Sequence, residues 1–243
     1  MDANYHSHQT PQFRVLSDRQ IERVYQATLD CLNRTGVNVH NAEARELLAR
    51  AGARVEGVRV RIPPHIIQAA VAANPRSFTL WGRDGKHRMH LVPDRVYFGP
   101  GPTCTYFIDP HTGEMRKTRR GDPALTAQVA DALDNIDYVM SLGLIDDVTS
   151  QLAPVYEFAE MLANTGKPVL PWAYSPDNVQ DIYHIALAVA GSEQALREKP
   201  FLALFSTYQS PLVHTKEDIA NVLWAVEHDI PVVYIGGGAA GAT

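Results

Sequence analysis

Aromatic side chains recur at the ends of the apolar segments that the sequence predicts as strands. These residues are Tyr97, Trp172, Tyr174 and Tyr208. The faces of aromatic rings hold a quaternary ammonium ion by cation–π attraction, which is worth about 0.5 to 2 kcal/mol per ring depending on desolvation. If these strand ends meet in one mouth, the pattern indicates a site for a dispersed positive charge. If they do not meet, the rings are ordinary core packing.

The same strand ends carry few groups for acid, base or nucleophilic chemistry. They contain no paired carboxylates on adjacent strands, no G-x-S-x-G or H-E-x-x-H motif, and no lysine for a Schiff base. His214 follows the strand predicted at 200–208 and is the histidine that we place in the site. Asp146 and Asp147 also follow a predicted strand. We expect them to accept hydrogen bonds or to balance a cation, and the alternative for Asp147 is that it caps the next helix. We assign no catalytic residue and no metal site, and the predicted substrate-binding residues are Tyr97, Trp172, Tyr174, Tyr208 and His214.

The composition is that of a soluble globular protein. Of the 243 residues, 45% are hydrophobic and 20% are charged, and the mean hydropathy is -0.19, which excludes a disordered, collagen-like or coiled-coil chain. No apolar run has the length of about 18 residues that a membrane span needs, and the N-terminus lacks the pattern of a signal peptide. We therefore expect a cytoplasmic protein without a membrane partner. Cys31 and Cys104 have no metal-type spacing and are expected to be reduced thiols.

The two halves of the chain differ in charge. Residues 1–120 carry 18 basic and 11 acidic side chains, whereas residues 121–243 carry 4 and 16. The basic residues are spread over helices and turns and do not form a run, so we predict no nucleic-acid partner. We expect the halves to complement each other within one fold or within a homo-oligomer.

The N-terminal part of the sequence predicts small, mixed elements. An amphipathic helix covers 17–35, with Ser17 as its N-cap and Gly36 just beyond its end. Further along, the hydrophobic period changes to two, which is typical of strands. Besides the first helix, the predicted elements are helices at 42–51 and from Pro63, a hairpin at 77–91 with its turn at Asp84-Gly85, and a hairpin at 103–118 that reverses at 109–113.

From about residue 121 the pattern becomes a regular alternation of strands and helices. The lengths between strands are those that a parallel sheet requires. The strands are almost continuously apolar, which fits burial on both faces. The predicted helices cover 122–135, 150–164 and 175–191 and a stretch that begins after Thr215, and the predicted strands lie at 96–101, 136–144, 168–174, 200–208 and 230–237.

Two architectures fit this alternation. A doubly wound sheet is possible, but the glycine cluster at 236–241 follows the last strand without a helix after it, and is weak evidence for nucleotide binding. We therefore predict an α/β fold of the (β/α)8 TIM-barrel type, incomplete with about five strands, over residues 94–243. A small α+β region over residues 1–93 precedes it. A complete barrel takes about 250 residues, so three strand–helix units are missing, and we expect the sequence to be a fragment.

Three segments, at 97–122, 206–218 and 232–243, resemble the trimethylamine methyltransferase (MttB-like) family, and the resemblance extends over nearly the whole chain. Its most specific features in combination are a D-x-x-T-G-E turn with a downstream Arg and Asp, and an S-P-L motif after the fourth strand. The residues are Asp109, Thr112, Gly113, Glu114, Arg116 and Asp122, and Ser210, Pro211 and Leu212. Family members are much longer, in agreement with the expected fragment.

This resemblance implies transfer of a methyl group from a methylamine or betaine to the cobalt of a separate corrinoid (cobalamin) protein. The corrinoid belongs to that partner, so no cofactor is expected to bind directly. A quaternary ammonium leaves as a neutral amine without a proton, which suits a site poor in acids and bases. The trimethylamine branch uses pyrrolysine in a later strand, whereas most of the family lacks it and acts on betaine-like amines such as glycine betaine. The resemblance therefore implies a betaine-type member by default.

Two alternatives stay open at this point. An unrelated (β/α)8 lyase or aldolase would need a metal-ligand set or a lysine on strands that this sequence does not contain. A non-catalytic module would bind quaternary amines or a corrinoid protein without turnover.

Overall fold

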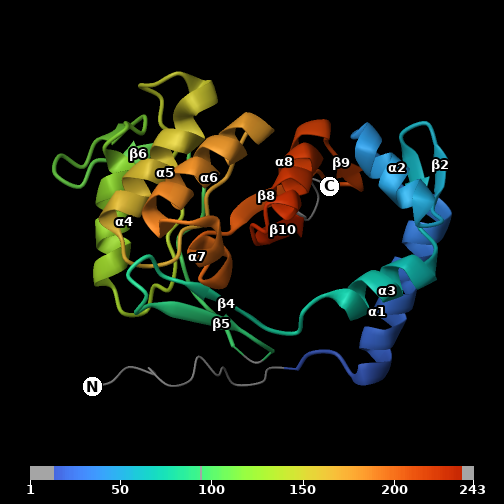
Figure 1. Ribbon diagram of the computed structural model, residues 1–243. Helices are drawn as coiled ribbons and strands as arrows, with labels where there is room; N and C mark the ends of the chain where they lie inside the picture. Colours follow the sequence, from blue (N-terminus) through green and yellow to red (C-terminus); the bar gives the residue numbers. More distant parts are fainter. Residues whose placement is uncertain (1–13, 94, 237–243) are drawn as a thin grey trace. The chain divides into compact units, whose positions relative to one another are not determined.

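The computed structural model describes residues 14–93 and 95–236 and shows a mixed α/β protein with helices and several small sheets (Figure 1). The chain divides into two compact units. The larger unit contains Ser77–Ser206 and Asn221–Val233. The described part of the smaller unit contains residues 14–76, Thr207–Ala220 and residues 234–236. Both units are thus built from segments that are far apart in the sequence.

The first helical segment of the smaller unit covers the predicted range of 17–35, but only its first part is an α-helix. The hydroxyl of Ser17 accepts a hydrogen bond from the Gln20 N–H, and the Gln20 side chain accepts one from the Ser17 N–H, which forms a capping box at the start of α1 (Asp18–Asp30). A π-helical turn (Cys31–Thr35) follows and ends at Gly36. Gly36 has a φ of 74°, and a Cβ there would overlap the carbonyl of Val60, so only glycine fits without strain.

A four-stranded sheet forms the centre of the smaller unit, in the order β2-β3-β1-β9. The pairs β2–β3 and β3–β1 are antiparallel, and the pair β1–β9 is parallel. Its bounds are β1 (Val37–Val39), β2 (Arg54–Glu56), β3 (Arg59–Arg61) and β9 (Val213–His214). Helices α2 (Ala42–Arg50) and α3 (Pro64–Ala73) accompany it. The sequence did not predict these strands, because runs of two or three residues are too short to show a period of two.

Several later helices lie where the sequence predicts them. Helices α4 (Asp122–Ala132), α5 (Ala153–Asn164) and α6 (Pro176–Ala190) lie side by side in Figure 1, and each has a proline in its first turn. A short 3-10 turn (Ser150–Leu152) precedes α5. Helix α8 (Lys216–Glu227) follows Thr215, whose hydroxyl accepts a hydrogen bond from the Asp218 N–H at 3.1 Å. The short α7 (Glu193–Glu198) was not predicted.

The chain segments between these helices pair with one another in chain order. Parallel bridges join Cys104 to Gly143, Val139 to Val169 and Val169 to Leu202, and strand β8 (Leu204–Tyr208) pairs with β10 (Val232–Gly236). The predicted parallel pairing of neighbouring segments is confirmed at these bridges. The described strands do not close into a barrel, so the incomplete (β/α)8 barrel stays a prediction.

The prediction of continuous strands at 96–101, 136–144 and 168–174 is wrong. These segments make only isolated bridges or single backbone hydrogen bonds, such as the one from the Asp137 N–H to the Phe98 carbonyl at 2.6 Å. Proline explains much of the difference, because it has no N–H to donate to a ladder. The first segment runs into Pro100, and Pro168 and Pro171 lie within the third.

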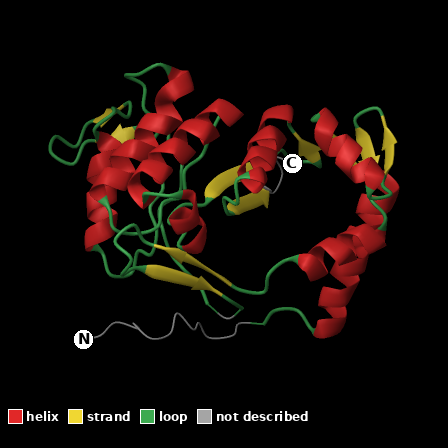
Figure 2. Cartoon of the chain, in the orientation of Figure 1, coloured by secondary structure: helices red, strands yellow, loops and turns green. Residues whose placement is uncertain are grey.

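Both predicted hairpins are confirmed (Figure 2). Strands β4 (Phe78–Trp81) and β5 (Arg88–Leu91) are antiparallel, and the turn between them contains Gly85 at a φ of 69°. Strands β6 (Phe107–Ile108) and β7 (Met115–Arg116) form the second hairpin, with Gly113 at a φ of 75°. A positive φ is the conformation for which glycine is favoured in such turns.

The main core of the larger unit lies between the parallel segments and the helices that follow them. Buried side chains from both layers meet there, and the largest or most enclosed are Val139, Phe158, Met161, Val169, Ile182 and Leu202. A second core group joins the β4–β5 hairpin to the parallel segments and includes Leu80, Met89, Met140, Leu170 and Ala203. The apolar character of the predicted strands therefore reflects burial, even where a regular ladder is missing.

None of the described helices is long and apolar enough to cross a lipid bilayer. Cys31 and Cys104 are exposed free thiols.

Candidate functional site

Trp172 and Tyr174 form an aromatic pair in the segment that precedes α6. Their ring centroids are 4.4 Å apart and the planes are nearly perpendicular, at 84°. Trp172 is half-buried, whereas Tyr174 is 47% exposed. The backbone N–H of Tyr174 donates to the side-chain oxygen of buried Asn178 at 3.2 Å, which fixes the chain at this point. The structure therefore brings two of the predicted site residues together, with one ring open to solvent.

Glu157 lies at the nitrogen edge of the Trp172 indole and was not predicted as a site residue. This side chain of α5 is only 1% exposed. One carboxylate oxygen, Oε2, accepts the indole N–H of Trp172 at 2.8 Å, and the other, Oε1, accepts the Ile145 N–H at 3.1 Å. Burial raises the pKa of Glu157, and the hydrogen bonds from Ile145, Trp172 and Ser141 oppose that rise. The residue is thus a buried carboxyl group in direct contact with the aromatic pair.

Tyr208 and His214 lie in a second aromatic cluster, which belongs to the smaller unit and also contains Tyr234. The centroids of the Tyr208 and His214 rings are 5.5 Å apart. The rings of His214 and Tyr234 are stacked, with their centroids 5.9 Å apart. His214 Nδ1 is 2.7 Å from the Tyr234 hydroxyl. Burial raises the pKa of Tyr234 to about 12, with further contributions from Asp218 and Tyr208. Gly236 leaves room for the Tyr208 ring, since a Cβ there would overlap it.

The structure corrects the place of His214 in the chain. The sequence predicts a loop after the strand at 200–208, but His214 is the last residue of β9 and pairs in parallel with Val39 of β1. The carbonyl of His214 accepts the His40 N–H at 3.0 Å. The strand was missed because its partner lies 175 residues earlier in the chain, as Val39 is to His214.

Lowering the pH from about 7 to about 5 should remove stability that depends on His214. Burial lowers the pKa of His214 from its ordinary value near 6.5, and Asp218 opposes this without reversing it. The unfolded chain then binds the proton more readily than the folded chain, so the contribution is complete above about pH 6.5 and is lost as the pH falls toward the folded pKa. Urea denaturation at both pH values, for the wild type and His214→Gln, measures this. An equal pH dependence in both proteins would contradict the expectation.

Tyr97, the remaining predicted site residue, packs with the core group of the β4–β5 hairpin. Its hydroxyl accepts the His90 N–H at 2.8 Å and donates to the His90 carbonyl at 2.9 Å. Both bonds attach the ring to β5. Trp172, Tyr174 and Tyr97 belong to the larger unit, and Tyr208 and His214 belong to the smaller unit. The single mouth predicted for all five stays a prediction.

The residues of the D-x-x-T-G-E motif form an ion network that fastens a hairpin to a helix. The guanidinium of Arg116 contacts Asp109 at 3.0 Å and holds both carboxylate oxygens of Asp122, at 2.7 and 2.9 Å. Asp122 also accepts the Arg119 N–H at 2.6 Å at the start of α4. Burial acts to raise the pKa of Asp122, but these hydrogen bonds outweigh it and leave the pKa lowered. These contacts give the motif a structural role, which is to hold the β6–β7 hairpin against the start of α4.

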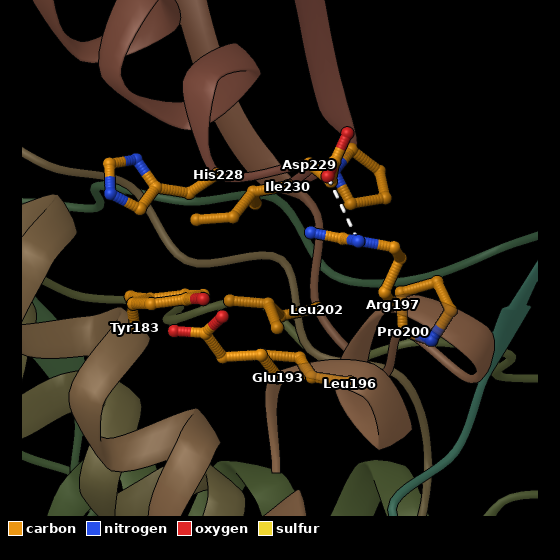
Figure 3. A pocket seen from close by; sticks show the side chains of 10 residues that line it. Tyr183, Glu193, Leu196, Arg197, Pro200, Leu202, His228, Asp229 and Ile230 are labelled. Carbon is orange, nitrogen blue, oxygen red and sulfur yellow. Dashed lines mark ion pairs between the residues drawn. The ribbon is translucent and has the colours of Figure 1, made fainter.

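Two small cavities do not match the predicted site. The cavity in Figure 3 lies before the start of β8 and β10, is crossed by the Arg197–Asp229 ion pair, and holds only about 10 Å³, room for one water molecule at most. A second cavity of about 150 Å³ lies beside Lys117, Asp146 and Asp147. There the Asp147 carboxylate accepts the Arg120 N–H at 2.8 Å and does not cap the next helix. Within the described residues, no group of three or more His, Cys, Asp or Glu side chains is placed to hold a metal ion.

The fold and the site define a mixed α/β protein with an aromatic candidate site that contacts one buried carboxyl group. A family model described as trimethylamine methyltransferase (MTTB) matches residues 1–243, so the chain belongs to the trimethylamine methyltransferase family. The family resemblance predicted from the sequence is therefore confirmed.

Curated relatives agree with this membership. A trimethylamine methyltransferase MttB of Desulfitobacterium hafniense is 32% identical over 229 residues, which are 93% of this chain and 46% of the relative. A glycine betaine methyltransferase from the same species is 24% identical over 96% of this chain and 49% of its own length. The Methanosarcina thermophila trimethylamine methyltransferase MttB is 27% identical over 91% of this chain and 47% of its own length. The chain spans about half the length of these relatives.

Proposed function

We propose that a protein containing this chain transfers a methyl group from a quaternary, betaine-like amine to the cobalt of a separate corrinoid protein. The observation that carries the proposal is the Trp172–Tyr174 pair, in which one ring is exposed and the other donates its N–H to a buried carboxyl group. Membership of the trimethylamine methyltransferase family supports the reaction class. We further propose that the parallel segments are part of an incomplete (β/α)8 barrel, in which sites lie at the carboxyl ends of the strands.

The aromatic pair suits a substrate that has no N–H to donate. A trimethylammonium group spreads its charge over its methyl groups, so ring faces bind it better than hydrogen-bond acceptors do, at about 0.5 to 2 kcal/mol per ring. The edge-to-face arrangement holds the two rings at right angles, which offers two sides of a cage.

The reaction requires this chain's own residues to bind and orient the substrate, and requires no proton transfer from them. The corrinoid of the partner protein supplies the electron pair that receives the methyl group. The bond from methyl carbon to nitrogen breaks, its electrons stay on nitrogen, and the amine leaves uncharged without needing a proton. Trp172 and Tyr174 therefore act by binding and orienting the ammonium group and by excluding water. We assign no acid or base to the step.

Replacing Tyr174 with alanine should weaken binding of glycine betaine by about 0.5 to 2 kcal/mol, because one ring face is lost. Tyr106→Ala is a matched control, since Tyr106 is a comparably exposed tyrosine, at 55%, beside the β6–β7 hairpin. Isothermal calorimetry on the full-length protein that contains this chain measures both variants. Equal affinities for Tyr174→Ala and Tyr106→Ala would remove Tyr174 from the site.

Tyr97, Tyr208 and His214 stay proposed substrate-binding residues, and a corrinoid protein and further copies of the same protein stay proposed partners. Alanine variants of Tyr208 and His214, titrated in the same way, test their part in the binding of glycine betaine.

A further inference from the structure

We propose that Glu157 is a positioning residue that fixes the indole of Trp172 and places a buried negative charge at its nitrogen edge, so that the site selects a trimethylammonium group over an uncharged group of the same shape. This inference rests on the proposed function and adds to it a source of specificity. The aromatic rings contribute binding energy. Glu157 determines the orientation of the Trp172 ring and the charge of the ligand that the site prefers.

The hydrogen bonds of Glu157 join three separate parts of the larger unit. The carboxylate comes from α5, Trp172 belongs to the segment after α5, and Ile145 belongs to the segment before it. Each carboxylate oxygen accepts one N–H from a different segment. An indole has a single N–H, so the bond at 2.8 Å fixes the direction of its nitrogen edge. Tilting the Trp172 ring would break this bond and leave a buried acceptor unpaired.

The charge of Glu157 has no cationic partner among the described residues. The ion pairs of the described chain involve other carboxylates, and the hydrogen bonds to Glu157 come from neutral donors. A buried carboxylate of this kind is costly unless a positive charge comes close. A ligand cation on the Trp172–Tyr174 pair would supply that charge, and the low-dielectric surroundings would strengthen the attraction.

A second buried polar group holds the segment that carries the aromatic pair. Asn221 is 2% exposed, and its Nδ2 donates at 3.0 Å to the carbonyl of Ala173, the residue between the two aromatic side chains. Its side-chain oxygen has no hydrogen-bond partner among the described residues. Asn221 is uncharged, so Glu157 is the source of the negative charge that favours a cation.

The test compares two ligands of equal shape and different charge. Glycine betaine has a trimethylammonium group, and 3,3-dimethylbutanoate has carbon in place of that nitrogen. Calorimetry on the full-length protein should show that Glu157→Gln lowers the affinity for glycine betaine about tenfold and changes the affinity for 3,3-dimethylbutanoate much less. A merely structural role would weaken both ligands alike, and that result would overturn the proposal.

A second variant separates charge from position. Glu157→Asp keeps the charge but is too short to reach the indole, so it should weaken both ligands while keeping the preference for glycine betaine. If Glu157→Gln does not fold, loss of this preference in Glu157→Asp would overturn the proposal instead. The proposed function fails differently, because the wild type would then bind neither ligand. Wild-type binding with an unchanged ligand preference in Glu157→Gln refutes only the role of Glu157.

Discussion

Replacing Phe158 with alanine is expected to lower the free energy of unfolding by about 3 to 5 kcal/mol. Phe158 is 0% exposed and lies in the main core of the larger unit, together with Val139 and Val169 from the parallel segments. Removing the ring deletes its buried apolar surface and leaves a cavity that rigid neighbours fill only in part. Urea denaturation followed by circular dichroism measures the loss.

Val129→Ala is the control for this experiment. Val129 lies on α4 and is 54% exposed, so its replacement is expected to change stability by less than about 0.5 kcal/mol. A loss below about 1 kcal/mol for Phe158→Ala would contradict the described packing of α5 against the parallel segments.

Replacing Lys167 with methionine should lower the free energy of unfolding by about 2 to 4 kcal/mol, through the loss of two hydrogen bonds from a side chain that is only 4% exposed. Its ammonium group donates to the carbonyls of Ala130 at 2.7 Å and Leu133 at 2.8 Å, at the end of α4. Carbonyl groups at a helix C-terminus have no partner within the helix and favour a positive charge. Methionine fills a similar volume but removes the positive charge, and leaves the carbonyls only the backbone N–H groups of Leu133 at 3.4 Å and Ile136 at 3.1 Å.

Thermal or urea unfolding of Lys167→Met, compared with Lys86→Met in the exposed turn between β4 and β5, measures this effect. Burial lowers the pKa of Lys167, and Asp131, Asp137 and Asp134 oppose this. If both variants lost the same small amount of stability, Lys167 would not be holding the end of α4.

The sequence predicted the elements whose ends carry a local chemical signal. Ser17 with Gln20 and Thr215 with Asp218 mark helix starts, and glycines at positive φ mark the hairpin turns. Such signals act within a few residues, so they can be read without knowing the fold. Strand continuity was overestimated, because apolar character reports burial and does not report whether the backbone forms a ladder.

The candidate site was only partly predictable for a related reason. Aromatic residues at strand ends identified Trp172 and Tyr174, which the structure brings together. Glu157 was missed because a glutamate in a helix is normally solvated, and its burial depends on an indole that comes 15 residues later. The apolar residues around it in α5, among them Phe158, were the available signal. Tyr234 was missed because an aromatic residue within an apolar strand is also typical of the core.

The most direct test of the proposed function is methyl transfer itself. The full-length protein that contains this chain is mixed with glycine betaine and a corrinoid protein in its cob(I)alamin state, and methyl–cobalt formation is followed by absorbance, with trimethylamine as the comparison substrate. We expect methyl–cobalt and dimethylglycine to form in equal amounts, at a rate that depends on the protein and falls in Tyr174→Ala. Absence of methyl–cobalt with glycine betaine, from a folded protein and an active corrinoid partner, would contradict the account, also if trimethylamine were demethylated.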